Sequence, residues 1–177
     1  RDEPAGPLPW ILAVSEGSAR RAAELGLGLA CSAFHQPEQA PHSFAAYQSA
    51  FRPSRHAAGI AAPQAFIAVR AIIGETQEEA ERLAMPVRAV FRQRRKPERI
   101  MLERLPELDE AMAIMDGMVP ADDADWPTFI VGTPERVAGR LRRMAALTGA
   151  DEFMIQDFLD DPELRLRNYK LLLREFA

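Results

Sequence analysis

The feature that most constrains the fold is a strand, a short turn and a helix within the first 27 residues. Residues 9–14 read Pro-Trp-Ile-Leu-Ala-Val, an apolar run of strand length, and residues 15–18 read Ser-Glu-Gly-Ser. A helical pattern follows at once, and Gly26 ends it. A direct passage from an apolar strand into a helix is typical of α/β proteins, in which strands and helices alternate.

The turn of this unit has the chemistry of an anion site. The first turn of a helix has N–H groups without helical acceptors and the positive end of the helix dipole, so it can hold a phosphate. Ser15 and Ser18 add hydroxyl donors, and Gly17 lets a ligand approach the backbone closely. Serine is also a preferred N-cap residue, so a helix that binds nothing would carry the same residues. Because Walker and dinucleotide glycine motifs are absent, the local pattern leaves both interpretations open.

The rest of the chain continues the alternation. Apolar runs predict four strands, at residues 10–14, 27–32, 64–73 and 153–155. Helical spacing and start signals predict helices at 18–25, 43–51, 76 to about 86, 87–95, 106–118, 135–147 and 162–176. The predicted fold is a parallel sheet with helices outside it, and residues 87–127 form an insert before the last strand.

Composition narrows the class of protein further. The chain has 177 residues, of which 47% are hydrophobic, and this predicts a single globular domain over residues 1–177. The net charge of -4 argues against broad binding to nucleic acid or to anionic membranes. No apolar stretch reaches membrane-spanning length. A single cysteine excludes an internal disulfide and fits a reducing compartment, so we expect a cytoplasmic protein.

Four segments, in order and at plausible spacing, carry a resemblance. They are Trp10-Ile11-Leu12 with Ser15-x-x-Ser18-Ala19; Tyr47-x-x-x-Phe51-x-Pro53-Ser54; Thr76-x-x-Glu79-Ala80; and Val131-Gly132-Thr133-Pro134-Glu135, followed by Asp151-Glu152-Phe153-Met154. Together they resemble the bacterial luciferase-like monooxygenase family, the flavin-dependent branch of the TIM barrels. The resemblance extends to the C-terminal half of that family only.

The resemblance implies a barrel of the (β/α)8 type, of which this chain supplies about the last four βα units. Residues 87–127 would then cover the pocket. The family's catalytic residues are expected in the N-terminal half, so no catalytic residue is assigned in this chain. We expect the chain to pair with that half or with another copy of itself, because four barrel strands leave open edges.

The resemblance also implies an activity, a flavin-dependent monooxygenase that uses reduced FMN, supplied by a flavin reductase, and oxygen on a small organic substrate. One alternative is a hydride-transfer oxidoreductase that uses the deazaflavin coenzyme F420. Another is a half barrel without catalytic activity, either a fragment or an assembly partner.

By position in the family, the flavin phosphate lies at Ser15, Glu16, Gly17, Ser18 and Ala19. Glu16 departs from a phosphate loop, because a carboxylate repels the ligand unless it points to solvent.

The second strand ends at another candidate segment, Ser32 to His35. Active sites of barrels form at the carboxyl ends of the strands, so we expect Ser32 beside the flavin, and Phe34 and His35 in the substrate pocket. His35, His42 and His56 lack metal-ligand spacing, and no metal site is predicted. One basic cluster is interpreted as a solvated helix end or as a contact with an acidic neighbour; its residues are Arg92, Arg94, Arg95, Lys96 and Arg99.

Overall fold

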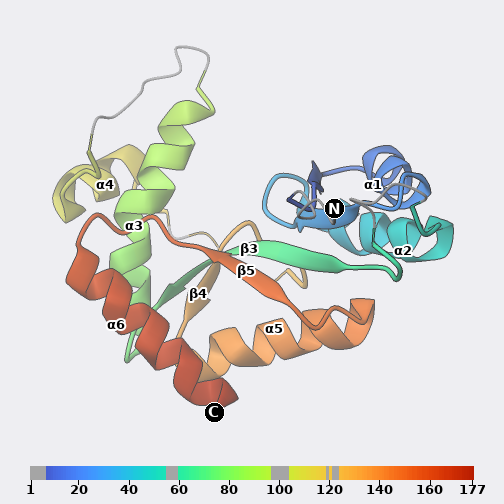
Figure 1. Ribbon diagram of the computed structural model, residues 1–177. Coiled ribbons are helices and arrows are strands. Elements are labelled where there is room, and N and C mark those ends of the chain that lie inside the picture. The colour runs from blue at the N-terminus through green and yellow to red at the C-terminus, as the bar shows by residue number, and fades with distance from the viewer. Residues whose placement is uncertain (1–6, 55–59, 97–103, 119, 121–123) are drawn as a thin grey trace. The chain divides into compact units, whose positions relative to one another are not determined.

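The computed structural model describes residues 7–54, 60–96, 104–118, 120 and 124–177, and these form two compact units (Figure 1). Unit 1 comprises Arg1–Val69, Asp125–Thr128 and Leu141–Ile155. Unit 2 comprises Arg70–Ala124, Phe129–Arg140 and Gln156–Ala177. Three elements have residues in both units: β3 (Ala65–Ile73), α5 (Pro134–Thr148) and β5 (Phe153–Gln156).

Unit 1 is built on parallel strands. Its remaining elements are β1 (Trp10–Ala13), α1 (Glu16–Glu24), β2 (Gly28–Ser32), the 3-10 helix η1 (Pro37–Gln39) and α2 (Ala40–Ala50). β1 pairs in parallel with β2, and β2 pairs in parallel with the first part of β3. All five residues of β2 are buried, as expected for a strand in the middle of a parallel sheet. Gly28 is required there, because a Cβ atom at this position would lie 2.5 Å from the Trp10 ring.

Unit 2 repeats the pattern of strand and covering helix. Its remaining elements are α3 (Gln77–Arg94), α4 (Leu108–Met115), β4 (Ile130–Gly132), α6 (Pro162–Leu173) and the 3-10 helix η2 (Arg174–Phe176). The second part of β3 pairs in parallel with β4. The core of unit 2 joins α3 to the strands through residues such as Leu83, Val87, Ile72 and Val131. The parallel α/β arrangement that the sequence predicts is therefore confirmed.

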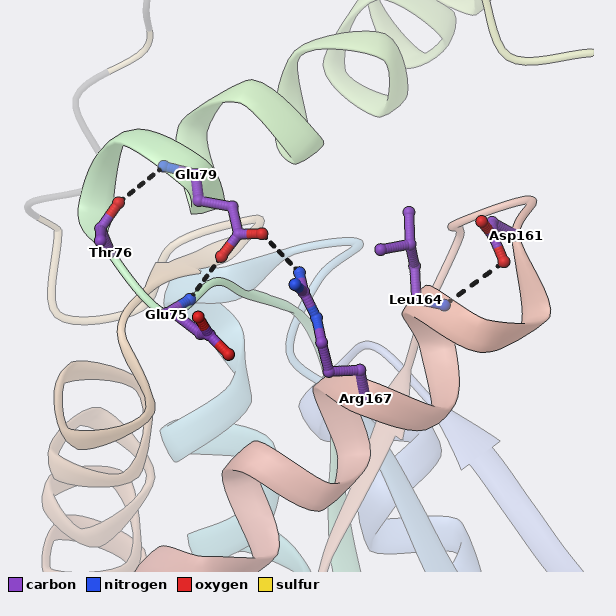
Figure 2. Close-up of polar contacts among 6 residues, drawn as sticks. All are labelled: Glu75, Thr76, Glu79, Asp161, Leu164 and Arg167. Atoms are coloured by element: carbon purple, nitrogen blue, oxygen red, sulfur yellow. Dashed lines mark hydrogen bonds and ion pairs between the residues drawn. The ribbon is translucent and has the colours of Figure 1, made fainter.

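The start of α3 and the helix α6 are joined by polar contacts, which Figure 2 shows. The Thr76 hydroxyl accepts a hydrogen bond from the Glu79 N–H at 3.1 Å, and the Glu79 carboxylate accepts one from the Glu75 N–H at 2.7 Å. The first contact is the N-cap hydrogen bond of α3, whereas the second reaches the N–H of Glu75, the residue before the N-cap, instead of that of Thr76 itself. The same carboxylate also accepts from Arg167 Nη2 of α6 at 2.6 Å. The carboxylate therefore both caps α3 and connects it to α6.

Two details of the predicted elements are wrong. The described residues contain five strands instead of four, because residues 130–132 pair with Ala71–Ile73 and form β4. The helices expected on either side of Pro86 are a single helix, α3. Proline removes one helical hydrogen bond, but Met85 and Val87 beside it are both buried, and their packing holds the helix together across the gap.

The second helix expected in the insert is present as α4, which packs on α3 through Met115 and Ala111. The interpretation of residues 87–127 as a pocket cover stays a prediction. In the described part of the chain, no helix combines the length and the apolar character needed to cross a membrane.

Candidate functional site

The first turn of α1 is organised by Ser15, which is the N-cap residue. Its backbone is extended (φ -140°, ψ 153°), and its Oγ accepts a hydrogen bond from the Ser18 N–H at 3.4 Å. The Ser15 hydroxyl donates to Ser18 Oγ at 3.3 Å, and the Ser15 carbonyl accepts from the Ala19 N–H at 3.0 Å. The two serines that the sequence singles out are therefore held against each other at the start of the helix.

This turn leaves donors available to a ligand. The N–H groups of Glu16 and Gly17 have no carbonyl acceptor within the helix, since they belong to its first turn. Ser18 is exposed, and a Cβ atom at Gly17 would meet nothing within 4 Å. Glu16 is also exposed, which is the condition under which its carboxylate is compatible with a bound phosphate. Ala19 is fully buried, so only its backbone lies at the turn.

The end of β2 presents the second candidate segment. Ser32 is 1% exposed, and its Oγ lies 2.8 Å from His35 Nδ1, so the buried hydroxyl fixes the orientation of an exposed imidazole. The rings of Phe34 and His35 lie 4.6 Å apart between centroids, tilted by 52°. Phe34 is buried. Of the three predicted residues of this segment, His35 is thus the one whose side chain is open to solvent.

The two segments follow neighbouring strands. β1 and β2 are parallel, with Ala13 opposite Cys31, so Ser15–Ser18 and Ser32–His35 both follow carboxyl ends at the same edge of the sheet. In α/β sheets, ligands bind outside the carboxyl ends of the strands. The structure therefore brings the predicted cofactor and substrate residues to one edge of unit 1.

Sequence reasoning missed a charged residue inside the longest strand. Arg70 of β3 is 7% exposed, and its guanidinium carbon lies 4.3 Å from the Phe91 ring centroid and 5.4 Å from those of Phe129 and Phe158. Its Nε donates to Gln156 Oε1 at 3.1 Å. Cation–π contacts of this kind stabilise a buried guanidinium. A single arginine in an apolar strand was the sequence signal for this cluster.

Asp157 is a second residue that the sequence reasoning missed. It directly follows β5, and burial raises the pKa of its carboxyl group. Its Oδ1 accepts a hydrogen bond from the Leu159 N–H at 2.7 Å, whereas the buried Oδ2 has no partner among the described residues. A carboxylate held this way is less stable as an anion than one in water.

Within the described residues, two further candidates from the sequence, Cys31 and Arg92, make contacts inside the fold. Cys31 is fully buried, its thiol donates to the Ala40 carbonyl at 3.6 Å, and burial raises its pKa to about 11, so it is not a nucleophile at neutral pH. Arg92 pairs with Asp116 at 2.6 Å. His56 and Arg99 lie outside the described residues, and within them no group of three or more His, Cys, Asp or Glu side chains is arranged for a metal.

The sequence is similar to a known protein family and to individual curated proteins. A family model for luciferase-like monooxygenases matches residues 1–152. The uncharacterized protein YceB of Bacillus subtilis is 29% identical over 174 residues, which are 96% of this chain and 50% of YceB. The chain thus spans about half the length of the curated relatives it matches.

Solved structures agree with this assignment. The crystal structure of apo-MsnO8 is 34% identical, with a TM-score of 0.83 over 98% of this chain and 52% of that chain. The oxygenating constituent of 3,6-diketocamphane monooxygenase from Pseudomonas putida, in complex with FMN, is 20% identical, with a TM-score of 0.61 over 97% and 48%. An F420-dependent secondary alcohol dehydrogenase is 12% identical, with a TM-score of 0.57 over 99% and 51%. These likenesses confirm the predicted fold class, the α/β fold of luciferase-like TIM barrels, of whose chains this one covers about half.

Proposed function

Because this chain belongs to the luciferase-like monooxygenase family, we propose that it holds the cofactor phosphate of a flavin-dependent monooxygenase that acts on a small organic substrate. Reduced FMN, when bound, supplies the electrons with which oxygen is activated. The residues of this chain bind and orient the cofactor.

The observation that carries the proposal is the first turn of α1. Two hydroxyls, the first-turn N–H groups and the positive end of the helix dipole lie together, next to open space at Gly17. This donor set fits a phosphate, since the Ser18 hydroxyl and the first-turn N–H groups of Glu16 and Gly17 can donate to it, the dipole contributes positive potential, and the Ser15 hydroxyl orients Ser18. The exposed Glu16 carboxylate is free to turn toward solvent and leave the turn to the ligand.

Ser32, Phe34 and His35 form the neighbouring part of the proposed site. The buried Ser32 hydroxyl lies 2.8 Å from His35 Nδ1 and orients the exposed imidazole. We assign Ser32 to the flavin side, and Phe34 and His35 to the substrate side. The parallel pairing of β1 and β2 supports this assignment, because it places this segment next to the phosphate turn.

The second candidate function is hydride transfer with coenzyme F420. A solved F420-dependent alcohol dehydrogenase shares the fold, and the turn of α1 suits the phosphate of either cofactor. The discriminating measurement is a parallel titration with FMN and with F420: tighter binding of F420 favours the second function, and tighter binding of FMN the first.

The proposal includes partners. In the described part of unit 1, β1 pairs with β2 alone, and Leu12 on β1 is 64% exposed. Since the chain covers about half of its relatives, we propose that this edge pairs with a complementary half barrel, from the same polypeptide or from a second copy. A flavin reductase in the cytoplasm would supply the reduced FMN, in keeping with the single cysteine.

The test separates effects on the stability of the fold from effects on the affinity for FMN. Gly17→Ala adds a methyl group where the fold has room, so we expect stability to rise by about 0.5 kcal/mol while FMN affinity falls about tenfold. Ser18→Ala removes one donor to the phosphate and should also cost about tenfold in affinity. Binding is measured by quenching of flavin fluorescence in the purified protein.

Two variants are matched controls. Gly139 of α5 also has nothing within 4 Å of the position that a Cβ atom would take, and Ser49 is an exposed serine of α2. Gly139→Ala and Ser49→Ala should therefore leave FMN affinity unchanged. Equal FMN affinity for the wild type, Gly17→Ala and Ser18→Ala would show that the turn only caps α1.

A further inference from the structure

Unit 2 contains a small pocket of about 150 Å³ beside the aromatic cluster of Arg70. Its lining comes from α3, from residues 104–105 and from the segment after β5. The apolar part of the lining consists of Val87, Val90, Phe91, Leu105 and Phe158. A pocket of this size holds one ring of about benzene size. The pocket therefore has room for a small molecule with an apolar body.

The charged part of the lining has an excess of positive charge. It consists of two guanidinium groups, Arg94 and Arg104, and one carboxylate, Asp160. Asp160 Oδ2 already accepts a hydrogen bond from the Leu105 N–H at 3.1 Å. The contacts of Arg104 with Glu107 and Glu110, at 3.9 and 4.0 Å, are at the outer limit of an ion pair and weak at an exposed site.

Two guanidinium groups lie near the Phe91 ring of the pocket. The Phe91 ring lies 4.3 Å from the Arg70 guanidinium and 5.3 Å from that of Arg94. Burial first, and then the charges of Arg95 and Arg94, lower the pKa of Arg70 to about 10. An anion at this place would relieve their mutual repulsion.

We propose that this pocket binds a small organic anion, a carboxylate carried on a single ring, with the ring against Phe91 and Phe158 and the carboxylate between Arg94 and Arg104. Arginine pairs well with a carboxylate because its fork of N–H groups matches the two oxygens. The ring edge and the guanidinium groups both meet aromatic faces, which is a favourable arrangement. The site uses none of the residues proposed for the flavin.

The probe is benzoate, added to the purified protein with 13C-labelled valine methyl groups. We expect the methyl resonances of Val87 and Val90 to shift, with a dissociation constant on the order of 1 mM. Benzyl alcohol and benzylamine, which have the same ring without the anion, should bind at least about tenfold more weakly. Absence of shifts at these valines, or equal binding of either comparator, would overturn the proposal.

Substitutions test the charges and the independence of the site. Arg94→Gln and Arg104→Gln should each weaken benzoate binding by about tenfold, whereas Arg20→Gln, an exposed arginine of α1, should leave it unchanged. Gly17→Ala should keep full benzoate affinity, because the pocket and the proposed flavin turn have no residue in common. Unchanged affinity in folded Arg94→Gln and Arg104→Gln, judged by their thermal transitions, would refute the role of the guanidinium groups. Loss of benzoate binding in Gly17→Ala would show that benzoate occupies the flavin turn.

Discussion

Glu79 has two separable roles, and substitution can measure each. Its carboxylate accepts hydrogen bonds from the Glu75 N–H at 2.7 Å and from Arg167 Nη2 at 2.6 Å. Glu79→Gln keeps an oxygen for the Glu75 N–H, because the glutamine amide also has an acceptor oxygen, but it cannot form the ion pair. Glu79→Ala removes both contacts. The difference between the two variants therefore isolates the cap.

The ion pair is partly buried, since the side chains of Arg167 and Glu79 are 34% and 20% exposed. Its loss should cost about 1–2 kcal/mol, between the values for surface pairs and for fully buried ones. The cap adds about 1 kcal/mol, so Glu79→Ala should cost about 2–3 kcal/mol in total. Glu163→Gln, at the exposed first turn of α6, is the matched control and should cost less than about 0.5 kcal/mol.

The dependence on pH gives the decisive result. The hydrogen bonds from the Glu75 N–H and from Arg167 lower the pKa of Glu79 below its ordinary value. A lowered folded-state pKa means that the stabilisation is complete above the unfolded pKa of about 4.3 and is lost as the pH falls through the folded pKa. Urea unfolding should thus separate the wild type from Glu79→Gln at about pH 7 and bring them together as the pH falls below the folded pKa of Glu79. A difference that does not change with pH, or no difference at about pH 7, would refute the role of the ion pair.

Two further substitutions test buried polar groups. Tyr47 is fully buried, and its hydroxyl lies 2.9 Å from the Leu27 carbonyl and 3.1 Å from the Gln64 carbonyl. Tyr47→Phe should therefore lower the free energy of unfolding in urea by about 1–3 kcal/mol. The control Tyr169→Phe, at a half-buried position, should lower it by less than about 0.5 kcal/mol. Burial raises the pKa of Asp157, which means that its ionised form destabilises the fold above the folded pKa; Asp157→Asn should therefore raise the urea midpoint at about pH 7, and the gain should vanish below the unfolded pKa of about 3.9. A lower midpoint for Asp157→Asn at neutral pH would mean that the charge itself is used in the fold.

The predictable parts of the fold are those with local signals. Ser15 and Thr76 predict the starts of their helices, because an N-cap hydroxyl accepts a hydrogen bond from an N–H only two or three residues later. The structure has both of these hydrogen bonds. β2 and β3 are apolar over nearly their whole length, which predicts strands buried on both faces. The candidate residues of the α1 turn and of Ser32–His35 could be predicted because each segment directly follows an apolar run of strand length.

The parts that could not be predicted depend on distant residues. β4 is only three residues long and exists because Ala71–Ile73 pairs with it. The helix α3 continues through Pro86 because the buried neighbours of the proline pack against the core. The aromatic cluster of Arg70 consists of Phe91 of α3, Phe129 and Phe158. These residues are far apart in the sequence, so no local pattern predicts that they come together.

The burial of Cys31 gives the protein an internal reporter of its own motions. The chain has one cysteine, which lies in β2 between β1 and β3, and burial raises the pKa of its thiol to about 11. A thiol-reactive reagent therefore modifies the native protein only in molecules whose β2 has transiently opened. The ratio of the modification rate to that of an unprotected thiol gives the equilibrium constant of this opening. Local unfolding around the proposed cofactor edge is thus measurable, with and without FMN, in a protein that carries no added label.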